Sequence, residues 1–229
     1  MTSMTSPTFQ GDGSLALLNP SSIKASTRCQ PDEYEFIDGR FARLKYLIAD
    51  FGGNLQPVKV RRTPHETIFS AWNPDREPDG YELVFGYSRL RACLELGLPV
   101  LALIERLSEF DALRQFVFEF RGHARWRPWR LARTLNGALE AGLFRSVRNA
   151  ADDLSMTVSE VKLLVELGRL PETVRSAYGN LDLTPVQANK LLRAYADSPH
   201  TVNANSRSCQ SGNFGSAPAV LAALTQEVV

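Results

Sequence analysis

Cysteine and histidine are both scarce in this chain of 229 residues, which has three of each. The cysteines are too few and too widely separated for a zinc knuckle, and their odd number argues against a disulfide scaffold. The histidines are also far apart in the chain, which leaves their separation in the folded protein open. We therefore expect free thiols in a reducing compartment, and the sequence contains no cluster of metal-ligating His or Cys.

Long apolar runs are missing as well. The longest, residues 96–104, is shorter than the ~20 residues that a membrane-spanning helix needs. The first residues, MTSMTSPTFQGDGS, lack the apolar centre of a signal peptide. We expect a soluble, cytoplasmic protein without a membrane partner, and its length leaves room for one or two domains.

Basic residues are concentrated in one part of a chain whose net charge is only +1. Residues 121–148 contain seven arginines and a single acidic residue, Glu140. Such a local excess suits phosphate contacts with DNA or a nucleotide, but a solvated helix face would give the same composition. The candidate phosphate-contacting residues are Arg121, Arg125, Arg130 and Arg133.

Strand and helix patterns alternate in the first half of the chain. Residues 1–18 are rich in Ser, Thr and Gly, and we expect them to be disordered. Helical spacing follows at residues 40–51, alternating or apolar strand patterns at 58–62, 81–86 and 100–107, and a helix at 88–97. Residues 19–107 are therefore expected to form a small α/β domain.

Every later segment up to residue 197 has a helical pattern. Ser108 and Asp111 resemble a capping box, and Pro128 suits the first turn of a helix. Residues 198–229 have the composition of a linker with a short tail. The predicted fold class is thus α+β: an α/β domain followed by an all-α domain at 108–197.

One stretch of the helical part, SVRNAADDLSMTVSEVKLLVELGRLPETV, has the spacing of a helix-turn-helix. Ala150, Ala151 and Leu154 give the first helix its apolar face, and Thr157 is a candidate N-cap for the second. A helical hairpin without any role in DNA binding would have the same pattern, so both interpretations remain open.

These segments together resemble the ParB family of partition proteins. VSEVKLLVELGRLPETV is similar to the family's recognition helix and the helix after it. GGNLQPVKVRR, GYELVFGYSRLRACLELGL and EFRGHARWRP resemble its three nucleotide motifs. All four occur in the family's order, over about residues 19–195. The resemblance implies a ParB/sulfiredoxin-like α/β domain and a helix-turn-helix domain.

The resemblance also implies a site for CTP and Mg²⁺. The nucleotide-binding residues would be Gln56, Gly86, Ser88, Arg89, Arg91 and Glu119. Ser88 stands where the family has an arginine, and Phe120 replaces an asparagine that helps to hold Mg²⁺, so Glu119 alone is left as a weak metal ligand. We therefore expect weak or altered nucleotide binding and doubtful CTP hydrolysis.

Double-stranded DNA is the partner that the resemblance implies, with partition of a plasmid or other mobile element as the function. The DNA-binding candidates are Arg145, Arg148, Thr157, Ser159, Glu160 and Lys162. A homodimer and a ParA-type ATPase partner are expected by the same resemblance, although the family's carboxy-terminal dimerisation domain is not evident. The alternatives to a partition function are a transcriptional regulator of a mobile element and a nucleotide-dependent enzyme or inhibitor.

A sulfiredoxin-like reaction is the other activity known for this kind of α/β domain. It needs Cys and His just before the phosphate-binding arginine. Here Tyr87 and Ser88 precede Arg89, and Cys93 comes a helical turn later on an expected core face. The sequence therefore argues against redox catalysis.

Overall fold

The computed structural model describes residues 13–25, 39–63, 80–121, 128–178, 183–210 and 222. The chain divides into two compact units, one made of Met1–Ala25 and Phe41–Ala112, the other of Ser26–Arg40 and Leu113–Val229. The first unit contains a mixed sheet with helices, and the described parts of the second contain helices alone. This arrangement confirms the predicted α+β class.

The sheet of the first unit has the strand order β1-β5-β3-β4-β2. Its strands are β1 (Ser14–Leu18), β2 (Ile23–Ala25), β3 (Val58–Arg62), β4 (Tyr81–Phe85) and β5 (Val100–Glu105). The β1–β5 and β3–β4 pairs are antiparallel, whereas β3–β5 and β2–β4 are parallel. The 3-10 turn η1 (Pro20–Ser22) leads into β2.

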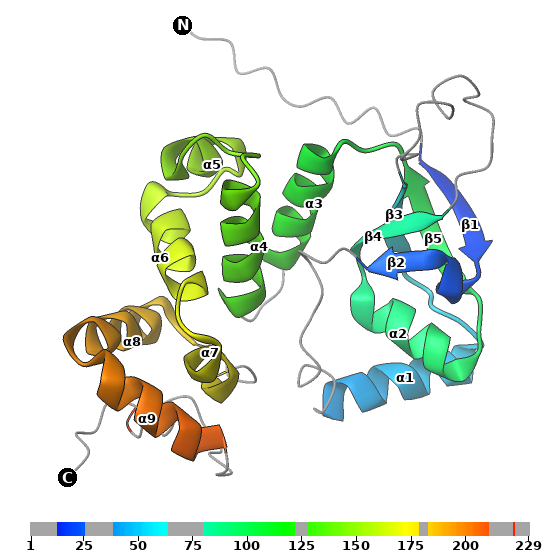
Figure 1. Cartoon of the computed structure of the whole chain (residues 1–229). Helices are drawn as coiled ribbons and strands as arrows, with labels where there is room; N and C mark the ends of the chain where they lie inside the picture. Colours follow the sequence, from blue (N-terminus) through cyan, green and yellow to red (C-terminus); the bar gives the residue numbers. More distant parts are fainter. Residues whose placement is uncertain are drawn as a thin grey trace, which may run out of the picture. The chain divides into compact units, whose positions relative to one another are not determined.

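Helices α1 (Gly39–Phe51) and α2 (Tyr87–Leu96) lie on the same side of the sheet (Figure 1). Their inward residues Ile48, Leu90 and Cys93 join alternate strand residues, among them Val58 and Val60, in the core. Alternation along each strand puts every second side chain on this face. The position predicted for Cys93 is confirmed, because its side chain is fully buried.

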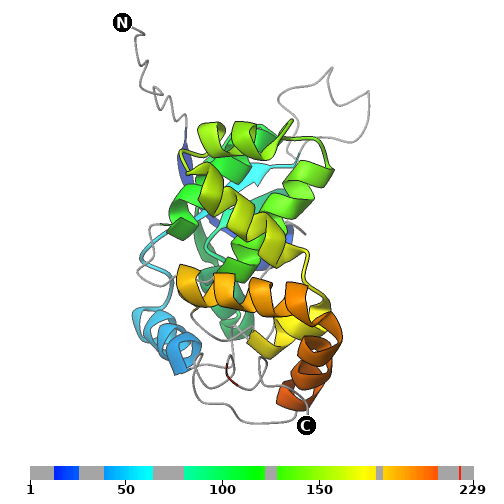
Figure 2. The same ribbon diagram turned by 90° about the vertical axis from the view of Figure 1, so that its left-hand side faces the viewer.

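The second unit continues with α3 (Glu109–Arg121), which begins in the first, and then α4 (Pro128–Glu140), α5 (Val147–Asp153), α6 (Val158–Gly168), α7 (Glu172–Tyr178), α8 (Pro185–Asp197) and α9 (Pro199–Gln210). Figure 2 shows α8 crossing α6, with α9 turning back from its end. No helix of the described residues is long and apolar enough to cross a membrane.

The tightest packing in this unit joins α4 to α6. Asn136 is buried in α4 and donates a hydrogen bond from Nδ2 to the carbonyl of Val165, at 3.0 Å. A Cβ on Gly168 would lie 2.1 Å from Nδ2 of Asn136 and 2.7 Å from the carbonyl oxygen of Ala132. Glycine at this position therefore permits the two helices to approach closely.

Two segments that composition predicts to be irregular are ordered elements. Residues 14–18, predicted to be disordered, form β1. Pairing with β5 satisfies the backbone N–H and C=O groups of this segment, and composition alone does not indicate such a pairing. Residues 199–210, predicted to be linker, form α9. Its residues Val202 and Ser206 are one helical turn apart and buried, and Asn203 accepts a hydrogen bond from Thr173, so a few inward residues outweigh a polar composition.

Candidate functional site

The predicted pair of helices joined by a tight turn corresponds to α5 and α6. Ser146 caps α5 by accepting a hydrogen bond from the backbone N–H of Asn149, at 3.1 Å. The chain reverses at Ser155, which has a positive φ of 52°. The N–H of Met156 donates to the carbonyl of Ala151 at 2.9 Å and closes the turn. Ala151 itself is buried, in agreement with the need for a small residue where the helices meet.

The start of α6 is closed by a reciprocal capping box. The hydroxyl of Thr157 accepts from the N–H of Glu160 at 3.2 Å, and the Glu160 carboxylate accepts from the N–H of Thr157 at 2.8 Å. The hydrogen bond from the Thr157 backbone is the main reason that the pKa of Glu160 lies below its ordinary value. Both residues are candidates for DNA contact, and both side chains are engaged in holding the helix end.

Arg121, at the end of α3, reaches the same helix start. Its Nη1 donates to the carbonyl of Ser155 at 3.0 Å, and its Nη2 lies 3.9 Å from Oε1 of Glu160. An arginine predicted to contact phosphate thus joins α3 to the turn and to the first turn of α6. Sequence reasoning missed this role, because the two groups are more than thirty residues apart in the chain.

The other arginines of the basic segment have different surroundings. The guanidinium of Arg130 lies over the ring of Phe120, 5.5 Å from its centroid, and Arg133 is half-buried on α4. Arg125 lies outside the described residues. Trp129, next to Arg130 on α4, is buried.

All six DNA-binding candidates are exposed around α5 and α6. Thr157 and Glu160 form the capping box, and the other four are Arg145, Arg148, Ser159 and Lys162. Arg145 and Arg148 have no ion pair within the described residues, whereas Lys162 lies 3.8 Å from Glu166 on its own helix. Of this unit's candidate cations, Arg145 and Arg148 are therefore the best placed to meet an outside anion.

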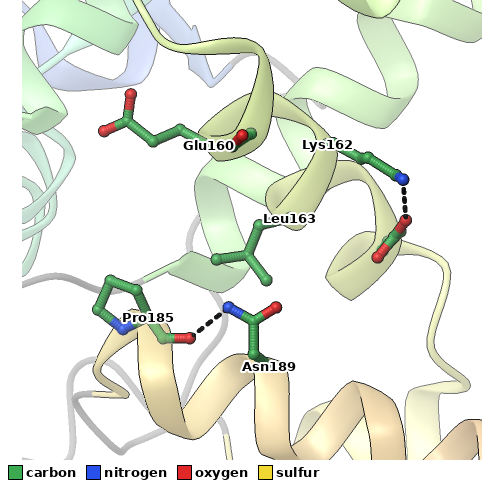
Figure 3. Close-up of a pocket in the computed structure, with 7 residues that line it drawn as sticks. Glu160, Lys162, Leu163, Pro185 and Asn189 are labelled. Atoms are coloured by element: carbon green, nitrogen blue, oxygen red, sulfur yellow. Dashed lines mark hydrogen bonds and ion pairs between the residues drawn. The ribbon is translucent and has the colours of Figure 1, made fainter.

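An open depression of about 370 Å³ lies between α6 and α8. In Figure 3, Leu163 of α6 points toward Pro185 and Asn189 of α8, while Glu160 and Lys162 extend to opposite sides of α6. Asn189 donates from Nδ2 to the carbonyl of Pro185 at 2.9 Å. With Ser159 at its edge, this depression borders the exposed surface of the candidate recognition helix.

The nucleotide candidates of the first unit meet at the start of α2. Gly86 caps this helix with φ of 100° and without a side-chain cap. Arg89, one turn into the helix, donates from Nη1 to the carbonyls of Gln56 and Pro57, at 3.3 and 2.8 Å. Two motifs more than thirty residues apart in the sequence are therefore in direct contact.

Asn54 holds the loop that carries Gln56. It is buried, donates from Nδ2 to the carbonyls of Gln56 and Leu101 at 2.8 and 2.9 Å, and accepts from the N–H of Leu101 at 2.8 Å. We did not single out this residue from the sequence. An asparagine next to two glycines is a common turn signal, but nothing local indicates a partner in β5.

Gly86 has a packing role in addition to its place in the motif. A Cβ at this position would lie 2.9 Å from Cγ1 and 3.1 Å from Cα of Val58. Within the protein, the missing side chain lets β3 approach the start of α2 closely.

The remaining nucleotide candidates are less closely connected. Ser88 is half-buried in the first turn of α2, and Arg91 donates from Nε to Oε1 of Glu95 at 2.8 Å. Lys45 and Arg91 together lower the pKa of Glu95. Glu119 lies on α3 in the second unit, half-buried.

The described residues contain no group of three or more His, Cys, Asp or Glu able to hold a metal ion. The thiol of Cys93 is buried against Asn54, and burial raises its pKa. A protonated, buried thiol is a poor nucleophile, which agrees with the argument against sulfiredoxin-like chemistry.

No protein-family model matches this chain, and no curated protein matches it. Solved structures of the C-terminally truncated chromosome-partitioning protein ParB from Caulobacter crescentus are similar to it. The complex with the centromeric parS site has 21% identity and a TM-score of 0.44, covering 91% of this chain and 97% of that one. The complex with CTP-γ-S has 20% identity and a TM-score of 0.37, covering 87% and 100%. At such scores neither likeness assigns the chain to a family, so function has to be argued from its residues.

Proposed function

We propose that this protein binds double-stranded DNA through α5 and α6, and that it acts as a ParB-like partition protein of a plasmid or other mobile element. The observation that carries the proposal is that Arg145, Arg148, Ser159 and Lys162 are all exposed on or just before two helices that pack together, the second of which has a capped start. In helix-turn-helix proteins the residues at the start of the second helix contact base edges, and the preceding elements contact the backbone.

The exposed polar and charged residues of α5 and α6 would have two different roles in DNA binding. Arg145 and Arg148 precede or begin α5 and would neutralise phosphates, while Ser159 and Lys162 project from the first turns of α6 and would face bases. The carboxylate of Glu160 holds the capping box, so its contribution to base recognition is secondary to its structural one. Two phosphate contacts predict a salt dependence with a slope of about −2 in log K against log salt from this pair alone.

Nucleotide binding is the second part of the proposal, with CTP as the ligand. The start of α2 suits a phosphate, since no side chain caps it and Arg89 is a residue of its first turn, with its guanidinium at the carbonyls of Gln56 and Pro57. The ParB resemblance implies that Gln56 would lie beside the base. Its carbonyl accepts hydrogen bonds from Arg89 and Asn54, which hold this loop in place. Bound nucleotide would give the protein a means of closing a clamp around DNA.

Mg²⁺ fits this chain less well. Glu119 is the one carboxylate that the ParB resemblance offers for the ion, and a single carboxylate holds Mg²⁺ only together with phosphate and water oxygens. We therefore propose nucleotide binding with slow hydrolysis or none, in a homodimer that a ParA-type ATPase would act on.

DNA binding is tested by capturing fragments of the host genome with the purified protein and sequencing them. The double variant Arg145→Ala/Arg148→Ala should lose most of its affinity for the recovered site and show a salt slope smaller by about 2. Its matched control is Arg169→Ala/Arg207→Ala, which removes two exposed cations from the same unit, at the end of α6 and near the end of α9. Equal losses in the two double variants would mean non-specific attraction, and no enrichment by the wild type would contradict DNA binding.

CTP binding is tested by calorimetry with and without Mg²⁺. Arg89→Ala should weaken CTP binding at least about tenfold, the loss of one charge-assisted contact, whereas Arg43→Ala, an exposed arginine of α1, should leave it unchanged. No heat of binding in the wild type would remove the nucleotide from the proposal.

Occupancy in the host separates partition from simple regulation. Crosslinking and sequencing should give one site with kilobase-scale shoulders if the protein spreads as a clamp. Narrow peaks at promoters would instead mean a transcriptional regulator, and would contradict partition while leaving DNA binding intact.

A further inference from the structure

Within the described residues, the edge of the sheet at β1 is unpaired and apolar. In the described part of the chain, Ser14–Leu18 pairs with β5 on one side and with no strand on the other. Its sequence, SLALL, has no charge and no proline, and its register with β5 has no bulge. Charged residues, proline and bulges are the usual means by which proteins keep edge strands from pairing.

Two leucines of β1 face away from the core. Ala16 and Leu18 pack against the core cluster on the side of α1 and α2. Alternation along the strand places Leu15 and Leu17 on the opposite face, where they are 63% and 67% exposed. Their partners on β5, Leu103 and Leu101, are half-buried and extend the apolar surface inward.

We propose that this edge pairs with the same edge of a second copy of the chain, forming an antiparallel β1–β1′ junction between two sheets. An antiparallel pair is related by a two-fold axis, so identical edges are complementary to each other. With the axis near Ala16, Leu15 of one copy faces Leu17 of the other, an apolar cross-strand pair. No charge on the strand opposes a second copy.

The small area of the β1–β1′ junction limits the affinity of the dimer. A stable interface buries about 800 Å² per partner, more than one five-residue strand and its leucines provide. The pairing is therefore weak and concentration-dependent, and a second contact such as shared DNA would strengthen it. This self-association does not depend on the proposed DNA or nucleotide binding.

Sedimentation velocity without DNA or nucleotide tests the proposal over a range of protein concentrations. The wild type should shift from one chain to two. The double variants Leu15→Glu/Leu17→Glu and Leu15→Lys/Leu17→Lys should each associate at least about tenfold more weakly, because like charges oppose each other across the junction. An equal mixture of the two variants should recover the dimer.

Leu94→Glu is the matched control, since Leu94 is another exposed leucine of this unit, on helix α2 over the other face of the sheet. It should dimerise as the wild type does. Circular dichroism and thermal melting show whether the charged variants are folded. A wild type that stays monomeric, double variants that dimerise normally, or folded variants whose mixture stays monomeric would each overturn the proposal. The last result would point to an extended peptide of another protein at this edge.

Discussion

Helices α2 and α6 begin in opposite ways, although the sequence marks both starts as candidate binding sites, that of α2 for a nucleotide and that of α6 for DNA. The start of α2 has a glycine cap, no side-chain cap and Arg89 in its first turn. The start of α6 is closed by Thr157 and Glu160, and the carboxylate of Glu160 accepts a backbone N–H. One helix end thus offers donors and positive charge, whereas the other is already occupied by the protein's own anion.

The difference determines whether each helix start attracts or repels a phosphate group. A carboxylate at the start of α6 stabilises the helix through its dipole, but it also repels a DNA phosphate from that end. The phosphate contacts of α6 must then come from side chains beside it. The first turn of α2 itself contains no acidic residue, so this helix end suits a phosphate better than the start of α6 does.

The largest effect is expected from Gly86→Ala at the start of α2. The new Cβ would meet Val58 at 2.9 Å in a backbone conformation of φ 100°, and we expect the free energy of unfolding to fall by about 3 kcal/mol. Gly97→Ala, at the other end of α2, is the control: φ is 67° but nothing lies within 4 Å, so the cost should be about 1 kcal/mol. Urea unfolding measures both, and equal losses would mean that Val58 moves aside.

A smaller loss in the free energy of unfolding is expected from Arg89→Ala. This loss would show that Arg89 at the start of α2 also stabilises the neighbouring loop. Removing its bonds to the carbonyls of Gln56 and Pro57 should cost about 2 kcal/mol and speed amide hydrogen exchange in residues 52–57. The exposed Arg91–Glu95 pair serves for comparison, and Arg91→Ala should cost less than about 1 kcal/mol. Unchanged exchange in the loop would show that Asn54 holds it alone.

The closed start of α6 is tested by Thr157→Ala. Loss of the hydroxyl that accepts from the N–H of Glu160 should cost about 1 kcal/mol, measured by urea unfolding. Thr184→Ala is the matched change in the capping box of α8, where the hydroxyl accepts from Gln187, and a similar cost is expected. A clearly larger loss at Thr157 would mean that the cap also holds the turn before α6.

Local patterns predicted most of the elements but not the contacts that distinguish the two helix starts. The helices and strands from α1 to α8 follow from periodicity, and the Thr157 cap follows from its place before an apolar run. The contact of Arg89 with Gln56, and that of Arg121 with Ser155, join segments more than thirty residues apart. No local spacing contains that information. Segments β1, β2 and α9 were missed for a related reason. Pairing with another strand orders β1 and β2, and a few buried side chains order α9, and neither is indicated by local composition.

The smallest and most specific effect is expected from Glu160→Gln, which makes the start of α6 resemble that of α8. Gln187 already accepts the N–H of Thr184 in α8 at 2.8 Å, so glutamine keeps the capping geometry and removes only the charge. At neutral pH the loss should be about 0.5 kcal/mol or less, because the pair with Arg121 is long and partly exposed.

The effect of Glu160→Gln on stability should depend on pH, and its effect on DNA affinity should be favourable. The pKa of Glu160 is lowered in the folded protein, so its stabilising effect is present above the ordinary carboxyl pKa of 4.5 and disappears as pH falls through the folded value. Wild type and Glu160→Gln should therefore differ in urea midpoint at pH 7 and converge at acidic pH. If α6 faces DNA as proposed, the variant should also bind the recovered site more tightly, by about two- to fivefold, because one repulsive charge is gone. Weaker binding would mean that the carboxylate itself accepts from a base, and that the closed helix start takes part in recognition.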